Sequence, residues 1–266
     1  MAAPQLPAVP LTLDGASVLH QMLRFRWPEW RALDVHARQR MLDGFYTFFE
    51  GQRHSAIYAL LGHKGDLLLL HFRNSFDELG ALERCLTKAE LWPYLEQTSS
   101  YLSVVELGLY ESSVKTYRSL IERGVHPHSE EWHRETSEVL ARQREAMRPR
   151  LFPEIPAGRY LCFYPMDRRR GEQKNWYVES LLERQRMMEE HGEVGRRYAA
   201  QVRQIISGSI GFDDWEWGVD LFADDPLVFK RLIYEMRFDE VSAVYALFGA
   251  FYVGRRLDRE GLLEFA

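Results

Sequence analysis

The sequence predicts an α+β protein made of two ferredoxin-like units that together form a dimeric α+β barrel-like subunit. Short runs in which apolar residues alternate are typical of strands, and longer runs with apolar residues three and four positions apart are typical of helices. These runs follow the order β-α-β-β-α-β in the first half of the 266 residues and again in the second half. That order is the ferredoxin-like one, and two such sheets can pair with their helices outside.

In the first unit we expect four strands and two helices. The first helix ends at Gly51, and the second begins at Ser75, which has Glu78 three residues on, as in a capping box. The expected strands are Val18–Phe25, His54–Leu61, Leu67–Phe72 and Tyr101–Tyr110, and the expected helices are Trp27–Glu50 and Ser75–Lys88.

A polar connector leads to the second unit, with helices expected at Lys115–Glu122 and Glu130–Met147. The first strand of the second unit should end at Pro165, because proline has no N–H for the ladder. A long helical region should follow, interrupted near Gly192 and Gly195. The expected elements of this unit are a strand at Arg159–Tyr164, the helical region Tyr177–Ser207, a short strand or turn from Ser209–Gly211, a strand at Trp215–Phe222, a helix after Asp225 and a strand at Phe248–Val253.

The domain organisation follows from this order. We expect a flexible N-terminal arm over 1–15, a first unit over 16–110, a helical connector over 111–156 and a second unit over 157–266.

Composition excludes several classes of function. The net charge of −5 and pI near 6.0 disfavour general nucleic-acid binding, which usually uses a basic face. No apolar run approaches the roughly 18 residues of a membrane span. The start of the chain has no basic segment typical of a signal peptide. Cys85 and Cys162 are too few and too far apart for a disulfide framework, so we expect a cytoplasmic protein with reduced thiols.

The segment 157–177 carries the first candidate residues. Tyr160, Cys162 and Tyr164 alternate on one face of a strand, and Arg168 and its two neighbouring arginines follow. A tyrosine at a strand end beside fixed positive charge suits an anionic, oxidisable ligand. The alternative is a core strand followed by a solvated turn.

Further candidates lie elsewhere in the chain. His191 follows two methionines and precedes a glycine, which suits an axial haem ligand or, alternatively, a half-buried helix-end histidine. Arg150 and Arg237 are candidate carboxylate anchors, since guanidinium binds carboxylates bidentately. The alternative for Arg237 is an ion pair with the acidic residues two and three positions on. Gln204 is expected in the helical region after His191.

The second half closely resembles the coproheme decarboxylases of the chlorite-dismutase-like superfamily. Four ordered motifs carry the resemblance: CFYPMDRRR…NWY (162–177), MMEEHGEVGRRYA (187–199), QIISGSIGFDDWEWGVDLFADD (204–225) and YEMRFDEVSA (234–243). The first half fits more loosely. The resemblance implies a homopentamer that uses hydrogen peroxide to convert two propionates of iron-coproporphyrin III (coproheme), both substrate and redox cofactor, into vinyl groups, giving haem b. It also implies transient contact with ferrochelatase.

The resemblance assigns roles to residues at matching motif positions. These are His191 as the proximal iron ligand, Tyr164 as the redox-active tyrosine, Gln204 as the distal polar residue, Met166 as a pocket residue, and Arg150, Arg168, Arg237 and Ser242 as propionate anchors. The family often has lysine where Arg168 stands, so a role for a lysine proton donor is in doubt here.

Two other functions compete with decarboxylation. A chlorite dismutase on the same fold would be expected to carry an arginine at the position of Gln204. A non-catalytic haem-binding or haem-delivery protein would need His191 and the arginines, but not Tyr164.

Overall fold

The computed structural model describes residues 6–266. Its strands are β1 (Thr12–Phe25), β2 (Ser55–Leu60), β3 (Leu67–Arg73), β4 (Leu95–Gly108), β5 (Tyr160–Arg168), β6 (Arg203–Gly208), β7 (Trp217–Ala223), β8 (Ala246–Phe248) and β9 (Tyr252–Arg256).

Helices connect and cover these strands. They are α1 (Trp27–Arg31), α2 (Val35–Tyr46), α3 (Phe76–Leu86), α4 (Tyr110–Glu122), α5 (Glu130–Ala146), α6 (Arg148–Leu151), α7 (Leu181–Arg197), α8 (Leu227–Met236) and α9 (Arg259–Leu263). The shorter segments are two 3₁₀ turns, η1 (Trp92–Tyr94) and η2 (Trp176–Val178), and one π-helical turn, η3 (Val241–Tyr245).

The strands form one antiparallel sheet in the order β7-β6-β4-β1-β3-β2-β9-β5-β8, and β7 also pairs with β5. All of them except β8 therefore close into a ring. The two halves of the ring are β4-β1-β3-β2 and β6-β7-β5-β9, each with the ferredoxin-like strand order, and they join at β4–β6 and β2–β9. The predicted α+β fold class is confirmed.

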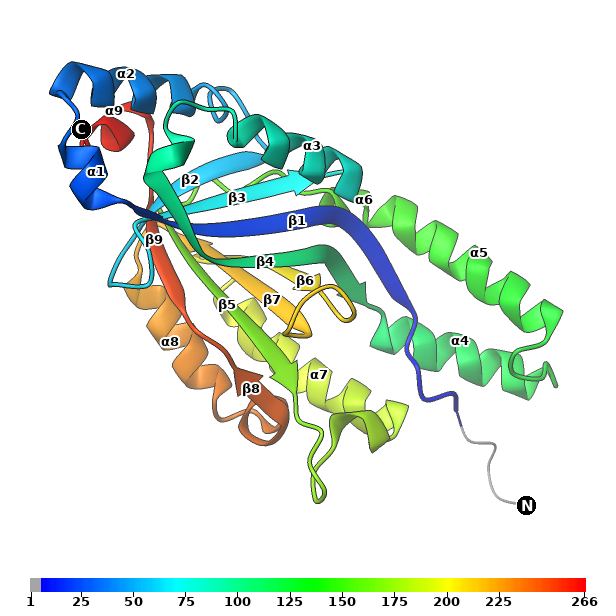
Figure 1. The fold of residues 1–266 in the computed structure, drawn as a ribbon. Coiled ribbons are helices and arrows are strands. Elements are labelled where there is room, and N and C mark those ends of the chain that lie inside the picture. The colour runs from blue at the N-terminus through cyan, green and yellow to red at the C-terminus, as the bar shows by residue number, and fades with distance from the viewer. Residues whose placement is uncertain (1–5) are drawn as a thin grey trace.

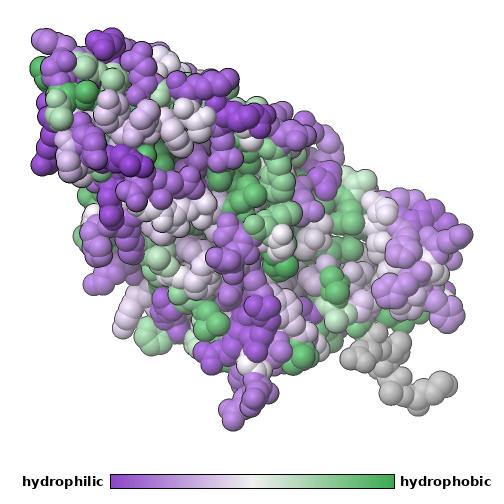
Figure 2. All heavy atoms as spheres, in the orientation of Figure 1, coloured by the Kyte–Doolittle hydropathy of each residue, from purple (hydrophilic) through white to green (hydrophobic). Residues whose placement is uncertain are grey.

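Apolar side chains pack on both faces of this sheet. Inside the ring, residues from both halves, such as Tyr58 and Phe163, form one cluster. Outside it, α2, α3 and α9 cover the first half, and α7 and α8 cover the second (Figure 1). Figure 2 shows hydrophilic surface over α2 and the far end of α5, and apolar surface in the middle of the same face. Within residues 6–266, no helix has the length and apolar character needed to cross a bilayer.

Two expectations for the first half need correction. The single helix expected over 27–50 is two helices, because Asp34 accepts a hydrogen bond from the N–H of Ala37 and starts α2 as a new N-cap. Of the flexible arm expected over 1–15, residues 1–5 lie outside the described part of the chain. β1 already begins at Thr12, so the last residues of the expected arm belong to a strand.

Three expectations for the second half were also wrong. Pro165 does not end its strand: it lies within β5, in the gap between the β9 and β8 ladders, and its carbonyl accepts a hydrogen bond from the N–H of Gly249. Gly192 and Gly195 do not interrupt α7, whose packing on α8 outweighs their cost of about 1 kcal/mol each. Gln204 lies in a strand, because β6 is paired with both β7 and β4.

The last predicted strand, 248–253, is also two strands. Both β8 and β9 pair antiparallel with β5, but the register shifts by one residue between them, from Phe248 opposite Met166 to Tyr252 opposite Phe163. In this break an added Cβ on Gly249 would lie only 2.8 Å from the Cγ of Pro165, so the chain lies close to β5 there.

Candidate active site

The candidate site lies between the outer face of the second half-sheet and α7. Alternation along β5 places Cys162, Tyr164, Met166 and Arg168 on this face. Tyr164 is paired with Val219 of β7, and Met166 with Trp217, so these strands share the face.

Gln204 joins the same face from β6. It is paired with Leu221 of β7, which in turn is paired with Cys162. Its Oε1 lies 4.0 Å from the point where a Cβ on Gly195 of α7 would be. The strand pairing therefore places Gln204 on the sheet side of the site, facing α7.

His191 lies on α7, which Ser180 caps by accepting a hydrogen bond from the N–H of Glu183. The His191 Nδ1 is 2.8 Å from the Oδ2 of Asp239 and 3.4 Å from the Oγ of Ser242. The Nε2 makes no hydrogen bond to another residue within 6–266. A histidine that binds a metal through Nε2 usually donates its other N–H to a carboxylate, which is the arrangement seen here.

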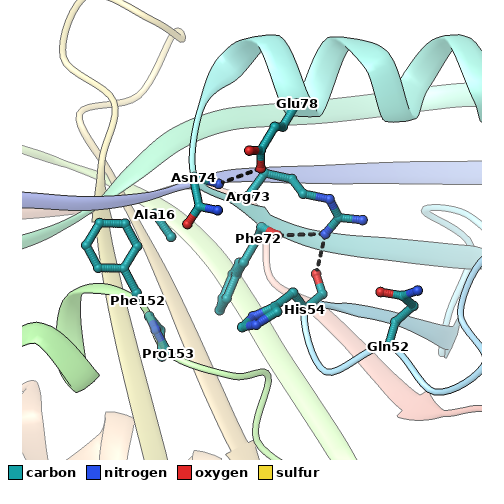
Figure 3. A pocket seen from close by; sticks show the side chains of 9 residues that line it. All are labelled: Ala16, Gln52, His54, Phe72, Arg73, Asn74, Glu78, Phe152 and Pro153. Carbon is teal, nitrogen blue, oxygen red and sulfur yellow. Dashed lines mark hydrogen bonds between the residues drawn. The ribbon is translucent and has the colours of Figure 1, made fainter.

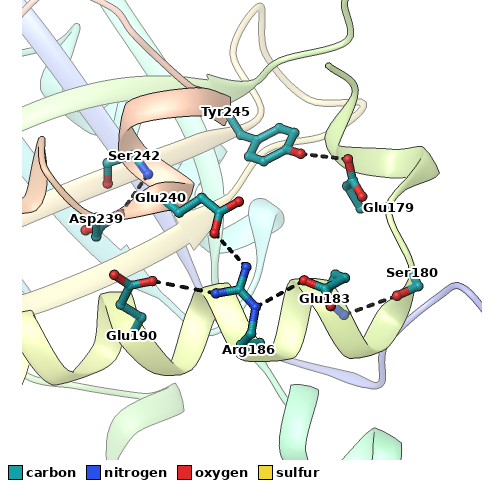
Figure 4. A network of polar contacts seen from close by, with 9 residues as sticks. All are labelled: Glu179, Ser180, Glu183, Arg186, Glu190, Asp239, Glu240, Ser242 and Tyr245. Atoms are coloured by element: carbon teal, nitrogen blue, oxygen red, sulfur yellow. Dashed lines mark hydrogen bonds and ion pairs between the residues drawn. The ribbon is translucent and has the colours of Figure 1, made fainter. Parts of the chain in front are cut away.

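Asp239 is held in place from two sides. Besides His191, its carboxylate accepts a hydrogen bond of 2.8 Å from the backbone N–H of Ser242, at the start of η3 (Figure 4). Burial acts to raise the pKa of Asp239, but the hydrogen bonds from His191 and Ser242 outweigh it and lower this pKa. Asp239 therefore remains ionised and keeps the His191 proton on Nδ1.

Arg168 is a half-buried cation at the end of β5. Its guanidinium lies 4.9 Å from the ring centroid of Trp176 and contacts the Sδ of Met188. No carboxylate within residues 6–266 forms an ion pair with it, whereas the neighbouring Arg170 pairs with Glu216. Burial lowers the pKa of Arg168. A half-buried cation of this kind would be stabilised by an anionic ligand.

Arg237 follows α8 and stacks on Phe248, with its guanidinium carbon 3.6 Å from the ring centroid. The expected alternative, an ion pair with the acidic residues that follow, does not form among the described residues: Asp239 bonds to His191, and Glu240 bonds to Arg186. Phe248 also packs against Tyr164.

Tyr164 lies at the centre of these groups. Its side chain is 5% exposed, and its ring packs on Phe251 at 4.6 Å between centroids. Burial raises the pKa of its phenol, and the charges of Arg237 and Arg168 only partly oppose this. Tyr164 therefore carries its proton at neutral pH.

Arg150 is the predicted residue that is not joined to this group. It lies on α6 with an exposed side chain, and within residues 6–266 no hydrogen bond or ion pair links its side chain to another site residue. The other seven predicted residues lie on β5, β6, α7 and the segment 237–242, which meet around the space between sheet and helix.

These residues suit a flat, anionic metalloporphyrin. His191 offers a single nitrogen ligand, the sheet face supplies apolar contacts, and Arg168 and Arg237 are cations with no carboxylate partner among the described residues. A cavity of about 480 Å³ is lined by 167–171 and Leu247, and Arg168 is the one member of this group in its lining. A separate cavity of about 270 Å³, around Arg73 and Phe152, lies in the first half (Figure 3).

Sequence reasoning missed the role of two neighbours. Asp239 orients His191, although it lies 48 residues further along the chain. Trp176 stacks under the Arg168 guanidinium. Both belong to the motifs quoted above, but only the fold shows what they contact.

Comparison with known proteins shows the family to which this chain is related. The family model described as chlorite dismutase matches residues 31–257. A coproheme decarboxylase from Staphylococcus saprophyticus is 40% identical over 97% of this chain and 98% of its own length. The resemblance expected from the motifs is confirmed.

Solved structures show the same relationship. A novel heme-binding protein from Thermus thermophilus superposes with a TM-score of 0.82 at 39% identity, covering 98% of this chain and 99% of the other. A mutant chlorite dismutase from Candidatus Nitrospira defluvii, at 14% identity, has a TM-score of 0.70 with 95% of each chain covered, and so shares the fold. The chain belongs to the chlorite dismutase family.

Proposed function

We propose that this chain catalyses the peroxide-dependent oxidative decarboxylation of two propionates of iron-coproporphyrin III to vinyl groups, giving haem b by way of a monovinyl intermediate. The observation that carries the proposal is the position of buried Tyr164 near Arg168 and Arg237, two cations without carboxylate partners among residues 6–266. The relative named coproheme decarboxylase supports it. A buried phenol beside two carboxylate anchors suits chemistry on a propionate.

When bound, the porphyrin iron supplies the redox chemistry with hydrogen peroxide. His191 would bind it through Nε2, while the hydrogen bond from Nδ1 to Asp239 fixes the tautomer and the ring orientation. Gln204 would lie across the ligand from His191, and Met166 would line its sheet side. Ser242, beside the His191 ring, and Arg150 are the further proposed propionate contacts.

Tyr164 would perform the step at the propionate. Oxidised by one electron, and with its proton passed to a propionate carboxylate held by the arginines, it would become a neutral radical that takes a hydrogen atom from the propionate β-carbon. The second electron would pass to the oxidised porphyrin, and loss of CO₂ would leave the vinyl group. Arg168 and Arg237 would hold the carboxylates so that this C–H faces the phenol, and such positioning is worth several kcal/mol of barrier.

The proposal includes the setting of the reaction. We expect a homopentamer in the cytoplasm that receives its substrate by transient contact with ferrochelatase. Light scattering of the purified chain tests the pentamer.

The direct test is a titration of the protein and iron-coproporphyrin III with hydrogen peroxide, followed by mass spectrometry. Monovinyl and then divinyl products are expected, and Tyr164→Phe should bind the porphyrin but form neither. Tyr160→Phe is the matched control, since Tyr160 lies two pleats away on the same face of β5. Absence of vinyl products from the wild type would refute the proposal.

The same preparation separates the rival functions. Oxygen release from chlorite without decarboxylation would indicate a chlorite dismutase, which the glutamine at position 204 disfavours. Porphyrin binding that yields no product, with or without Tyr164, would indicate a haem-binding or haem-delivery protein.

A further inference from the structure

A pair of aromatic rings leads away from the candidate site. The Trp176 ring lies under the Arg168 guanidinium, and its centroid is 5.5 Å from that of Tyr245, at an interplanar angle of 62°. Both side chains are only 2% exposed. Trp176 and Tyr245 belong with Val241 and Met187 to one small apolar cluster beside α7. Direct ring contact therefore runs from the site to Tyr245.

Tyr245 ends this path at a carboxylate. Its phenol O–H donates a hydrogen bond of 2.6 Å to the Oε1 of Glu179, as Figure 4 shows. Its backbone carbonyl accepts a hydrogen bond of 2.7 Å from the N–H of Arg169, which fixes the tyrosine against the end of β5. Tyr245 is the last residue of η3, the turn that also contains Ser242 beside His191.

The charges favour oxidation at Tyr245 over oxidation at Trp176. An electron removed from Trp176 leaves a positive ring directly below the Arg168 cation, which is unfavourable at this distance. A tyrosine that loses an electron becomes a strong acid and releases its phenol proton. Glu179 can accept that proton within the existing hydrogen bond, and so the oxidised ring becomes neutral.

We infer that Trp176 and Tyr245 form a one-electron relay that carries oxidising equivalents out of the porphyrin site, with Glu179 as the proton acceptor. The inference rests on the proposed function, which supplies the oxidant: the bound iron porphyrin after reaction with hydrogen peroxide. Trp176 gives one electron to the oxidised site and takes one from Tyr245. The Tyr245 proton moves to Glu179, which leaves a neutral tyrosyl radical and a carboxylic acid. An external one-electron donor then restores the tyrosine and its proton returns from Glu179.

The relay would operate when no propionate is in place for Tyr164. The Tyr164 phenol has no hydrogen-bond acceptor of its own among residues 6–266, whereas the Tyr245 phenol has Glu179. Next to Glu179 and Tyr245, Figure 4 shows a network in which Arg186 bonds to Glu240 and Glu183. The side chains of Arg186 and Glu240 are exposed, so the relay ends beside a charged, solvent-exposed network.

The test uses the full chain loaded with haem b, which carries no propionate due for removal. One equivalent of hydrogen peroxide is added, and the sample is frozen within milliseconds for electron paramagnetic resonance. In a Tyr164→Phe background a tyrosyl signal is expected, and adding Tyr245→Phe should abolish most of it. Adding Glu179→Gln instead should lower its yield by about tenfold or more, because the proton acceptor is lost.

Tyr198→Phe is the matched control. The Tyr198 phenol also donates to a glutamate, at 2.7 Å from the Oε2 of Glu235, but no aromatic pair joins Tyr198 to another ring in the part of the chain that the structure describes. The control should leave the signal unchanged. Equal signals with and without Tyr245, or equal losses from the Tyr245 and Tyr198 variants, would overturn the relay.

Failure of the relay can be told from failure of the proposed function. If coproheme yields vinyl products but the tyrosyl signal of the haem b complex does not depend on Tyr245, only the relay is refuted. If the Tyr245 signal appears but coproheme yields no vinyl products, only the decarboxylase assignment is refuted. If the chain binds neither porphyrin, both proposals are refuted.

Discussion

The hydrogen bond between His191 and Asp239 gives the sharpest prediction. Asp239→Asn keeps the shape of the side chain but removes its charge. If the amide oxygen keeps its bond from the Ser242 N–H, the amide nitrogen faces His191 Nδ1, which must then become an acceptor. The His191 proton would move to Nε2, the atom proposed to bind iron. The substitution therefore opposes ligation.

The expected magnitude follows from the burial of the pair. The Asp239 side chain is 1% exposed and that of His191 is 21% exposed, so water replaces the lost bond poorly. Loss of a group that orients a metal ligand costs about 10- to 100-fold in metal affinity. This corresponds to about 1.4–2.8 kcal/mol, and the forced tautomer places the expected effect at the upper end.

The assay is a spectrophotometric titration of the metal-free protein with haem b at pH 7. Resonance Raman of the ferrous form adds a second readout, since a weaker Nδ1 hydrogen bond should lower the iron–histidine stretching frequency. Glu240→Gln is the matched control: the next residue in the chain, it loses the same charge, but its ion pair with Arg186 is exposed to water. Equal affinities of the two variants would refute the proposed role of Asp239.

Three further predictions concern other parts of the molecule. Arg168→Gln should weaken binding of coproheme more than that of its tetramethyl ester, and exposed Arg169→Gln should not; equal losses for both porphyrins would argue against a carboxylate anchor. Asp220→Ala should lower the free energy of unfolding by about 3 kcal/mol or more in urea titrations, because it leaves fully buried His20 without its 2.8 Å partner. Burial lowers the pKa of His71 to about 3, so stability should be retained above pH 6.5 and fall by up to about 1.4 kcal/mol per pH unit below it. The melting temperature of His71→Gln should fall less steeply than that of the wild type as the pH is lowered below 6.5. An unchanged slope would contradict this.

The elements with a strong local pattern could be predicted from the sequence. Ser75 caps α3 as expected, by accepting a hydrogen bond from the N–H of Glu78. The apolar run of β3 is buried on both faces, as a strand inside a covered sheet should be. Local patterns fail where pairing between distant segments decides, as at Gln204 in β6 and at Pro165 within β5. Neither the pairing of β6 with β4 nor the gap between β8 and β9 leaves a signal in the adjacent residues.

The candidate site shows the same limit. The motifs single out His191, Tyr164 and the arginines, but they cannot show which charges are already neutralised. Arg237 precedes two acidic residues, so an ion pair was the simpler expectation. The fold directs Asp239 to His191 and Glu240 to Arg186 instead, and leaves Arg237 stacked on Phe248. The availability of this cation for a ligand is a property of the tertiary structure alone.

The two halves of the ring explain why the site is found in only one of them. Both have the same strand order, and both need helices to cover their outer face. In the first half the end of the chain completes that cover: Leu257 and Leu262 enter the cluster formed with α2, and the Trp30 indole donates to the carbonyl of Phe265. In the second half the equivalent face presents Tyr164 and Arg168 on β5, beneath a helix that carries a histidine. A repeated fold therefore supports two roles, since one outer face is closed by apolar packing while the other keeps polar and charged groups that a ligand can satisfy.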